Sequence, residues 1–417
     1  MKTTLTSFLL LTGSAVLSQP SIPVDLLTGR AEITIPLGSI TTNDLTAPFL
    51  LAYESSGIKP HEAGGNAGVN WNLVAGGSVR REVRSLPDDY QGNSQDTNDN
   101  RRGWLVNGNA QLINSFVPNG DDNLTVCADE ASDWSFINGL GYQVDTEPDI
   151  FSFNAPGLSG QFVFGADMQP KLIPYQDLKV EPQFLSGKIV SITITRNDGV
   201  KYVFAYAEKT VRKVNYFSNS NAPLSQFSTE LEQYRKSTEF TSAWNLTKIQ
   251  TVSGNEITFC YGSCGLGTNH FEDVFNSERE VRITNTGSNA TSQAFRQYKI
   301  KDVVTSSFLS SIYSRSMRVE FLYTHYNRLV QVNVVDQALG NRKVFKLNYK
   351  AVRNPSEDRG KEFLFGVTEA SNSCENFPSF TFEYYDVTPA SSYQTTSLTF
   401  NRPTNETEQE TKLDYWG

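Results

Sequence analysis

The chain has 417 residues, 12% aromatic and 19% charged, which is enough apolar material to bury a substantial core and argues against disorder. Its 36 Lys and Arg residues against 45 Asp and Glu residues give a net charge of −9, which disfavours nucleic acid and anionic membrane surfaces as partners. Four cysteines and three histidines exclude a disulfide scaffold and leave little material for a zinc site or a histidine-based catalytic centre.

Residues 1–18 have the pattern of a secretory signal peptide. Lys2 precedes an apolar stretch over residues 5–17, and Val16 and Ser18 stand at the −3 and −1 positions of the expected cleavage point. The alternative for this segment is a short N-terminal membrane anchor. The longest later apolar run, Pro48–Tyr53, is far below the ~20 residues of a transmembrane helix. We therefore expect a secreted or cell-surface protein without a membrane span after cleavage.

Patterns of period two dominate the rest of the chain and predict β-strands that pair in hairpins. The clearest turn is Asp198-Gly199, because Gly supplies the positive φ that a tight turn needs. Helical signals are confined to one or two turns at Ser228–Lys236. The strand patterns lie at 31–37, 150–164, 189–206, 244–261 and 317–349. The fold class expected is all-β, with antiparallel hairpins in one or two β-sandwich or β-sheet domains.

Shifts in composition suggest how these strands are divided. An aromatic and Gly-rich domain over residues 19–186 gives way near Gly187 to a hairpin-rich domain over residues 187–388, and a polar tail or linker follows at 389–417. Polar loops are expected at Pro87–Arg102, Pro118–Asp133 and Asn276–Gln293.

Four segments, in this order, resemble the N-terminal region of secreted Rhs/YD-repeat proteins of Gram-negative bacteria. They are PVDLLTGRAEITIPLGSI with LTAPFLLAYESSGIKP, then GVNWNLVAGGSVRREVRSLPDD, EPDIFSFNAPGLSGQFVF and SAWNLTKIQTVSGNEITFCY. The resemblance runs from about residue 22 to the end of the chain. Tyr326-Asn327-Arg328-Leu329 is similar to a degenerate YD unit and Tyr385-Asp386 is a weaker one, but the tandem array of such units is missing.

Bodies of this family are long ribbons of hairpins that wind into a hollow shell, and many enclose or present a toxic C-terminal domain. The resemblance therefore implies sheets that lead into a YD-repeat-like β-ribbon, and a non-enzymatic structural role in assembly, encapsulation or display of an effector. The implied partner is the remaining shell or a C-terminal effector segment. Either the chain is a fragment, or it is a short relative that keeps the leading domains.

Two tryptophans and two glycines are expected to have structural roles. Gly76 and Gly77 allow backbone to approach closely near Trp71, and Trp244 stands in an apolar strand pattern, so we expect both rings to be buried. A phosphate cradle is excluded because no Gly-Lys-Ser/Thr follows these glycines. Cys260 and Cys264 could form a disulfide across a turn or remain free thiols, and both states are favoured over a metal site.

Candidate chemistry is sparse, and no enzyme activity, metal or cofactor is expected. Glu147 and Asp149 are the best paired carboxylates, although Pro148 between them indicates a turn before a strand. His61 beside Glu62 is a weak candidate base.

Two ligand hypotheses remain open. Oxygen donors over residues 88–100, which include Asp88, Asp89 and Asp99, could bind calcium, but a solvated acidic loop is the default interpretation. The alternative function is a carbohydrate-binding or adhesive cell-surface module, which would require exposed tryptophans. Its candidate residues are Trp104, Trp134, Trp244 and Trp416.

Overall fold

The computed structural model describes residues 32–55, 65–92, 99–115, 135, 139, 144–218, 238–262, 272–285, 294–324, 328–337, 340, 342–352, 361–371, 380–382, 384, 388–389 and 398–399. The expected signal peptide, the helical turns at Ser228–Lys236 and nearly all of the polar tail lie outside the described residues.

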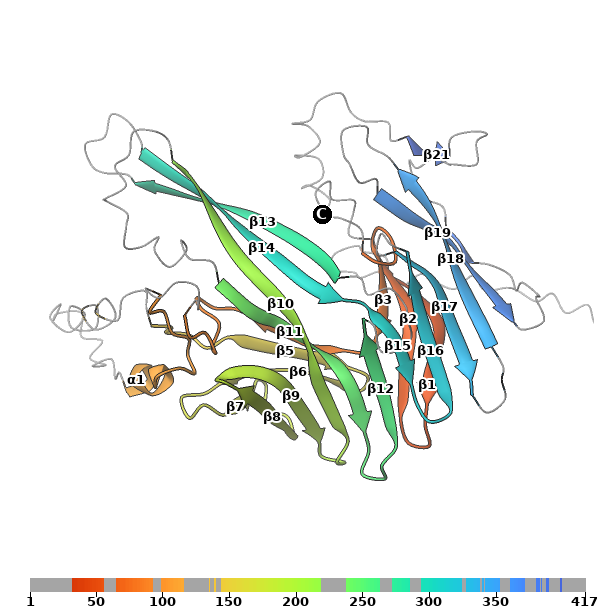
Figure 1. Cartoon of the computed structure of the whole chain (residues 1–417), viewed down its shortest axis with the longest axis horizontal. Coiled ribbons are helices and arrows are strands. Elements are labelled where there is room, and N and C mark those ends of the chain that lie inside the picture. The colour runs from red at the N-terminus through yellow and green to blue at the C-terminus, as the bar shows by residue number, and fades with distance from the viewer. Residues whose placement is uncertain are drawn as a thin grey trace, which may run out of the picture.

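Strands build almost all of the described chain, and they form two hydrogen-bonded sheets (Figure 1). The first sheet is an antiparallel meander of β1 (Glu32–Thr41), β2 (Thr46–Glu54) and β3 (Trp71–Ala75). One short helix, α1 (Asn109–Ser115), lies between β4 and β5 in the chain. The second sheet contains β4 (Ser78–Glu82), β5 (Ile150–Ala155), β6 (Leu158–Phe164), β7 (Pro170–Leu172), β8 (Leu178–Leu185), β9 (Lys188–Arg196), β10 (Lys201–Ser218), β11 (Thr238–Gln250), β12 (Glu256–Tyr261), β13 (Glu272–Asn285), β14 (Ala294–Ser307), β15 (Leu309–Tyr313), β16 (Met317–Tyr323), β17 (Leu329–Asp336), β18 (Arg342–Val352), β19 (Lys361–Ser371), β20 (Phe380–Thr381), β21 (Thr388–Pro389) and β22 (Leu398–Thr399).

Two long strands, β10 and β11, connect the branches of the second sheet. The first residues of β10 pair with β9, and Lys209–Ser218 pair with β14, which carries β13 on its other side. Ala243–Asn245 of β11 pair with β4, and Lys248–Gln250 pair with β12. From β12 the sheet continues through β15, β16, β17 and β18 to β19, and from β4 it continues through β5 and β6 to β7.

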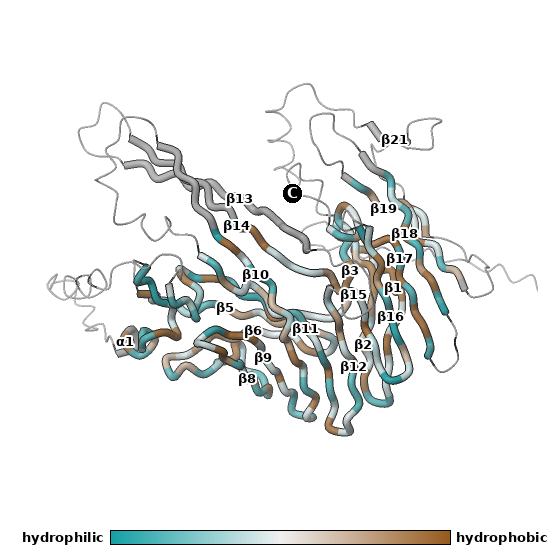
Figure 2. The backbone as a smooth tube through the Cα atoms, in the orientation of Figure 1, coloured by the Kyte–Doolittle hydropathy of each residue, from teal (hydrophilic) through white to brown (hydrophobic). Residues whose placement is uncertain are grey.

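The two sheets share one apolar core. Alternate side chains of β5 are buried, namely Phe151, Phe153 and Ala155. Figure 2 shows hydrophobic and hydrophilic residues interleaved along the strands. The first sheet lies beside β15–β17 (Figure 1), and the ring of Phe49 on β2 meets the ring of Phe321 on β16 at 6.3 Å between centroids. The pairing of β1 with β2 shifts its register between Pro36 and Gly38. A Cβ on Gly38 would lie 2.8 Å from the ring of Phe49.

The expected all-β fold with antiparallel sheets is confirmed. The predicted hairpins appear as β5–β6, β9–β10, β11–β12 and β16–β17–β18. Gly199 and Gly254 adopt positive φ in two of the turns, which is the reason that glycine stands there. The rings of Phe151 and Phe162 stack across β5–β6 at 4.8 Å, as expected for aromatic cross-strand pairs.

The segment Asn276–Gln293 was predicted to be a loop, but its first part belongs to β13; local Ser, Thr and Asn content does not prevent pairing with β14. Strands from both sides of Gly187 share the second sheet, because β4 pairs with β11. The domain boundary there and the YD-repeat-like ribbon remain predictions.

Candidate functional site

The two candidate carboxylates, Glu147 and Asp149, lie just before β5 and differ in their exposure to solvent. The Glu147 side chain is 62% exposed and lies 3.7 Å from the guanidinium of Arg84, whereas the Asp149 side chain is fully buried. They therefore do not converge on one substrate position. Asp149 instead joins a buried group of charged residues that includes Asp88, Asp89, Asp145 and Arg81, which we call the Arg81 cluster.

Arg81 occupies an inward position of β4, in phase with buried Val79. Its Nη1 donates to Asp89 Oδ1 at 2.8 Å, and its Nε lies 3.5 Å from Asp149 Oδ2. The guanidinium also lies over the rings of Phe151 and Trp244, about 5 Å from each centroid. The cation is thus surrounded by two carboxylates and two aromatic faces.

The aspartates of the Arg81 cluster bind backbone amides of distant segments. Asp149 Oδ1 accepts from the Arg84 amide at 2.8 Å and Oδ2 accepts from the Asp88 amide at 2.9 Å. The hydrogen bonding between Asp88 and Asp149 is reciprocal, because Asp88 Oδ1 accepts a bond from the Asp149 amide at 2.8 Å. Asp89 Oδ2 accepts from the Ile189 amide at 2.8 Å. These bonds hold the loop after β4 to the start of β5 and to β9.

The cluster is short of positive charge. Four aspartates, Asp88, Asp89, Asp145 and Asp149, are buried, and one guanidinium, that of Arg81, interacts with only the first two and the last of them. Within the described chain, Oδ2 of Asp88 and Oδ2 of Asp145 are buried with no hydrogen-bond partner. An unpaired buried charge is costly, so protons are expected to reduce it.

The pKa values of the aspartates follow from this balance. Burial, and then the charge of Asp149, raise the pKa of Asp88 well above its ordinary value and that of Asp145 to about 8. Burial also raises the pKa of Asp149 to about 6, although Arg81 opposes the rise. For Asp89 the effect of burial is outweighed by Arg81, and the pKa is lowered. At neutral pH, Asp89 is therefore the ionised partner of Arg81, while Asp145 retains its proton.

The described parts of the acidic segment, residues 88–92 and 99–100, contain buried aspartates in place of the solvated loop expected from sequence. Asp88 and Asp89 belong to the Arg81 cluster, and buried Asp99 accepts two bonds from the Arg101 guanidinium, at 2.9 and 2.8 Å. Tyr90 donates to Asp99 Oδ2 at 2.8 Å. Residues 93–98 lie outside the described residues. Among the described residues, no group of three or more His, Cys, Asp or Glu side chains could hold a metal ion.

The predicted structural residues lie where strands approach closely. Trp71 and Trp244 are 1% and 0% exposed, and Trp244 Nε1 donates to the carbonyl of Ile189 at 3.2 Å. A Cβ at Gly77 would collide with the carbonyl of Asn154 on β5, and one at Gly76 would come within 3.3 Å of the Phe259 ring. These contacts leave room only for glycine at Gly77.

The Arg-Leu pair of the degenerate YD unit attaches to the Gly-rich segment. Arg328 Nη1 donates to the carbonyl of Gly65, and its Nε pairs with Glu362 Oε2 at 2.5 Å. The amide of the buried Leu329 donates to the carbonyl of Asn66 at 2.9 Å. A Cβ on Gly68, whose φ is +106°, would lie 3.2 Å from the backbone of β19. The Gly-rich segment is therefore fixed to β17 and β19.

Other candidates fall mostly outside the described part of the chain. His61 and Glu62, and also Trp134 and Trp416, lie there. Cys260 is disulfide-bonded, but every other cysteine lies outside the described residues, so its pairing with Cys264 remains a prediction.

Trp104 is buried, and its Nε1 donates to the carbonyl of Phe164 at 2.9 Å. Within the described chain, α1 is too short to cross a bilayer and there is no other apolar helix that could.

Sequence reasoning missed Arg81 and Asp145. Arg81 carried a usable signal, because a charged residue in phase with an apolar one on an alternating strand indicates a buried ion pair. Asp145 carried none, since it stands among polar residues whose burial depends on contacts with distant segments.

Chemically, the cluster offers buried acids that tie backbone segments together. Its raised pKa values resemble those of catalytic acids. However, all four aspartates are buried, so a substrate could reach them only if the loop moved.

Comparisons with known proteins give structural neighbours alone. No family model matches the chain, and no curated protein matches it. The crystal structure of TcdB2-TccC3 is similar over 87% of this chain, with 12% identity and a TM-score of 0.36. A Photorhabdus luminescens Tc holotoxin pore is similar over 86%, with 12% identity and a TM-score of 0.35. The N-terminal domain of effector protein SpvB from Salmonella typhimurium is similar over 84%, with 11% identity and a TM-score of 0.33.

The extent of these matches differs. The chain covers 16% of the TcdB2-TccC3 chain and 99% of the SpvB domain. The structural neighbours are thus toxin-associated proteins. At such low identities and TM-scores, the likeness does not decide what this chain does, and membership of the Rhs/YD-repeat family remains a prediction.

Proposed function

We propose that this chain is a non-enzymatic structural part of a secreted or cell-surface β-shell of the Rhs/YD-repeat type, serving the assembly, encapsulation or display of an effector. The observation that supports the proposal is that the buried charged side chains bind backbone groups of other segments of the chain. Asp88, Asp89 and Asp149 hold backbone amides of separate segments, and Arg328 ties the Gly-rich segment to β19.

The sheet itself supports this role. Hairpins join from β7 to β19 in one hydrogen-bonded network, and the strands carry apolar side chains toward a shared core. A wall needs this kind of extended, cross-tied sheet, whereas an enzyme needs reactive groups that a substrate can reach. The partner proposed is the remaining shell or a C-terminal effector segment.

The first test asks whether the Arg81 cluster is catalytic. Purified protein is incubated with a panel of glycan, ester and peptide substrates, beside an Asp149→Asn variant. We expect no turnover by either protein. Turnover that disappears in Asp149→Asn would overturn the structural role.

The second test addresses assembly. The chain is expressed with the coding sequence that follows it in its natural gene, and the product is examined by limited proteolysis and negative-stain electron microscopy. We expect a hollow particle that protects the following polypeptide from protease. A free monomer that associates with no encoded polypeptide would refute the proposal.

The alternative expected from the sequence, a carbohydrate-binding module that presents tryptophans, is not favoured by the described tryptophans. Trp71, Trp104 and Trp244 are all buried, and each indole N–H donates to an oxygen of the protein.

A further inference from the structure

Residues 83–92 and 99–108, which we call the loop segments, belong to no strand or helix of the described chain. The two segments are bound to each other, since the Gly103 amide donates to the Tyr90 carbonyl at 2.8 Å. A Cβ on Gly103 would lie 2.1 Å from the carbonyl oxygen of Pro87, so the backbones approach closely. The loop segments therefore form one unit beside the strands.

Carboxylates of the Arg81 cluster attach this unit to the strands. Asp149, just before β5, accepts bonds from the amides of Arg84 and Asp88, and Asp88 accepts a bond from the Asp149 amide. Asp89 accepts a bond from the amide of Ile189 on β9. The pairing of β4 with β5 and β11 ends before the loop segments begin. The loop segments can therefore detach while the sheets remain paired.

The charged groups that face the buried acids come from every neighbouring element. They are buried Arg81 and exposed Glu82 on β4, Asp88, Asp89 and exposed Arg84 in the loop segments, Asp145, Asp149 and exposed Glu147 before β5, and Lys188 on β9. Of the three cations, Arg81 is the one that is buried, and it interacts with Asp88, Asp89 and Asp149. One buried positive charge thus stands against four buried acids.

Further ionisation of these acids would weaken the attachment. Within the described chain, Oδ2 of Asp88 and Oδ2 of Asp145 are buried and have no hydrogen-bond partner. A negative charge on either oxygen would be costly, because neither water nor a donor would stabilise it. Detachment of the loop segments would let water reach both oxygens. Burial and the charge of Asp149 raise the pKa of Asp145 to about 8, so its ionisation falls just above neutral pH.

We infer that the Arg81 cluster is a pH-sensitive latch, which holds the loop segments to the start of β5 and to β9 at neutral and mildly acidic pH and releases them as the pH rises. The released state keeps both sheets paired, so it differs from global unfolding. This goes beyond the structural role proposed above, because it makes one part of the chain responsive to pH. It stands whether or not the chain assembles into a shell.

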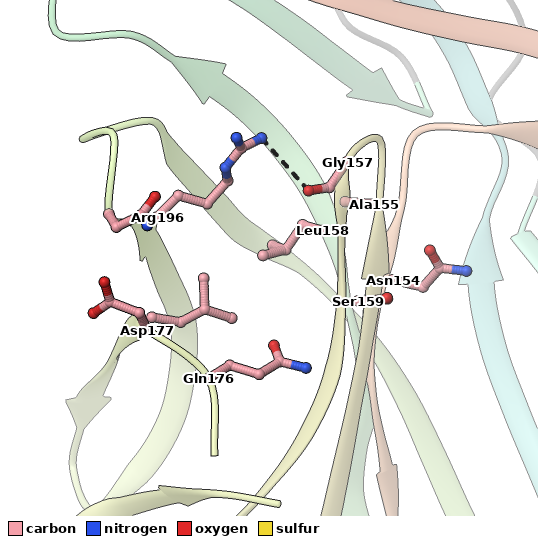
Figure 3. Close-up of a pocket in the computed structure, with 10 residues that line it drawn as sticks. Asn154, Ala155, Gly157, Leu158, Ser159, Gln176, Asp177 and Arg196 are labelled. Carbon is pink, nitrogen blue, oxygen red and sulfur yellow. Dashed lines mark hydrogen bonds between the residues drawn. The ribbon is translucent and has the colours of Figure 1, made fainter. Parts of the chain in front are cut away.

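The other end of β5 provides an internal reference. At the tip of the β5–β6 hairpin, the Arg196 guanidinium donates to the Gly157 carbonyl at 3.5 Å, and Asp177 lines a hollow of about 600 Å³ beside the hairpin (Figure 3). Arg196 also pairs with Asp198, whose side chain is 44% exposed, and Asp177 is exposed. Since solvent reaches both acids, no buried charge develops there as the pH rises.

The test measures hydrogen exchange of the full chain by mass spectrometry at pH 6.0 and 8.5, with each rate divided by the intrinsic exchange rate at that pH. In wild type, protection of amides in the loop segments should fall by about tenfold or more, because ionisation of Asp145 favours release by up to about tenfold per pH unit. Urea at about 1 M should leave this exchange unchanged, as expected for a local opening. Amides of the β5–β6 hairpin should stay at least about tenfold better protected than the loop segments at both pH values.

Asp145→Asn keeps the shape of the side chain but cannot ionise, so protection of the loop segments should then change by no more than about twofold over the same pH range. Asp177→Asn, the same substitution at an exposed aspartate, is the matched control and should behave as wild type. Circular dichroism verifies folding; Asp88→Asn, which removes another buried carboxylate and should also reduce the pH response, serves if Asp145→Asn does not fold.

Three results would overturn the inference. The first is equal protection of the loop segments at both pH values. The second is exchange of the loop segments at the same rate and with the same urea dependence as the β5–β6 hairpin, since the cluster would then act on global unfolding alone. The third is a folded Asp145→Asn variant that loses protection with pH as wild type does.

Discussion

The Arg81 cluster predicts that this protein loses stability as pH rises through the neutral range, because it buries acids that are favoured in their protonated form. The decisive variant is Asp145→Asn, which keeps the shape and the accepting oxygen of the side chain but cannot ionise. The pKa of Asp145 is raised from 3.8 to about 8 by burial and by the charge of Asp149. A raised carboxyl pKa means that the folded state binds the proton more tightly than the unfolded state does.

Below about pH 4 the carboxyl is protonated in both states and has no effect on stability. Between about pH 4 and pH 8 the unfolded state loses the proton first, so the free energy of unfolding falls by up to about 1.4 kcal/mol per pH unit. Over about four units the limit is about 5–6 kcal/mol if the loop stays closed. We expect about 2–3 kcal/mol, because the loop can open and let water reach the carboxylate.

The assay is urea unfolding followed by tryptophan fluorescence at several pH values from 4.5 to 8.5. Wild type should lose about 2–3 kcal/mol relative to Asp145→Asn across this range. Asp177→Asn, the same substitution at an exposed aspartate, is the control and should run parallel to wild type. Parallel curves for wild type and Asp145→Asn would refute the reasoning, since the buried carboxyl would then bind its proton equally well in both states.

Three further predictions concern the close approach of β4 to β5, the attachment of the Gly-rich segment to β17 and β19, and the disulfide of Cys260. Gly77→Ala should cost about 2–3 kcal/mol of unfolding free energy, because the added Cβ would collide with atoms of Asn154 and Ala155 on β5. Gly139→Ala is the control: no atom of the described residues lies within 4 Å of a Cβ there, so the free energy of unfolding should change by less than about 0.5 kcal/mol, and equal urea midpoints for the two variants would contradict this. Arg328→Met should cost about 1–3 kcal/mol in the same assay through loss of its bonds to Gly65 and Glu362, and an unchanged midpoint would show that this attachment is unimportant. Peptide mapping without reduction should recover Cys260 linked to Cys264, and recovery of Cys260 linked to any other cysteine would disprove that pairing.

Hairpins were the part of the fold that sequence could predict. Asp198-Gly199 and Ser253-Gly254 combine turn residues with flanking alternation, and both signals are local. Pairings between distant segments were not predictable, because nothing in β4 indicates that its partner is β11. The strand β13 was missed, since its pairing with β14 overrides a composition that is typical of loops.

The candidate site was only partly predictable for the same reason. Asp149 was identified as a carboxylate of interest, but its role depends on Asp88 and Arg81, which reach it through tertiary contacts. An Asp- and Asn-rich segment such as residues 88–100 looks solvated in isolation. The burial of Asp89 and Asp99 depends on Arg81 and Arg101, which pair with them.

The position of the first sheet has a consequence for synthesis. The apolar side of β1–β3 is covered by β16 and its neighbours, as the contact between Phe49 and Phe321 illustrates. A ribosome makes β3 long before it makes β16, so the nascent chain carries an uncovered apolar sheet for most of its elongation. Native contacts of this range also slow folding after release. Chaperone binding and aggregation of truncated nascent chains are therefore expected to concentrate on residues 32–75.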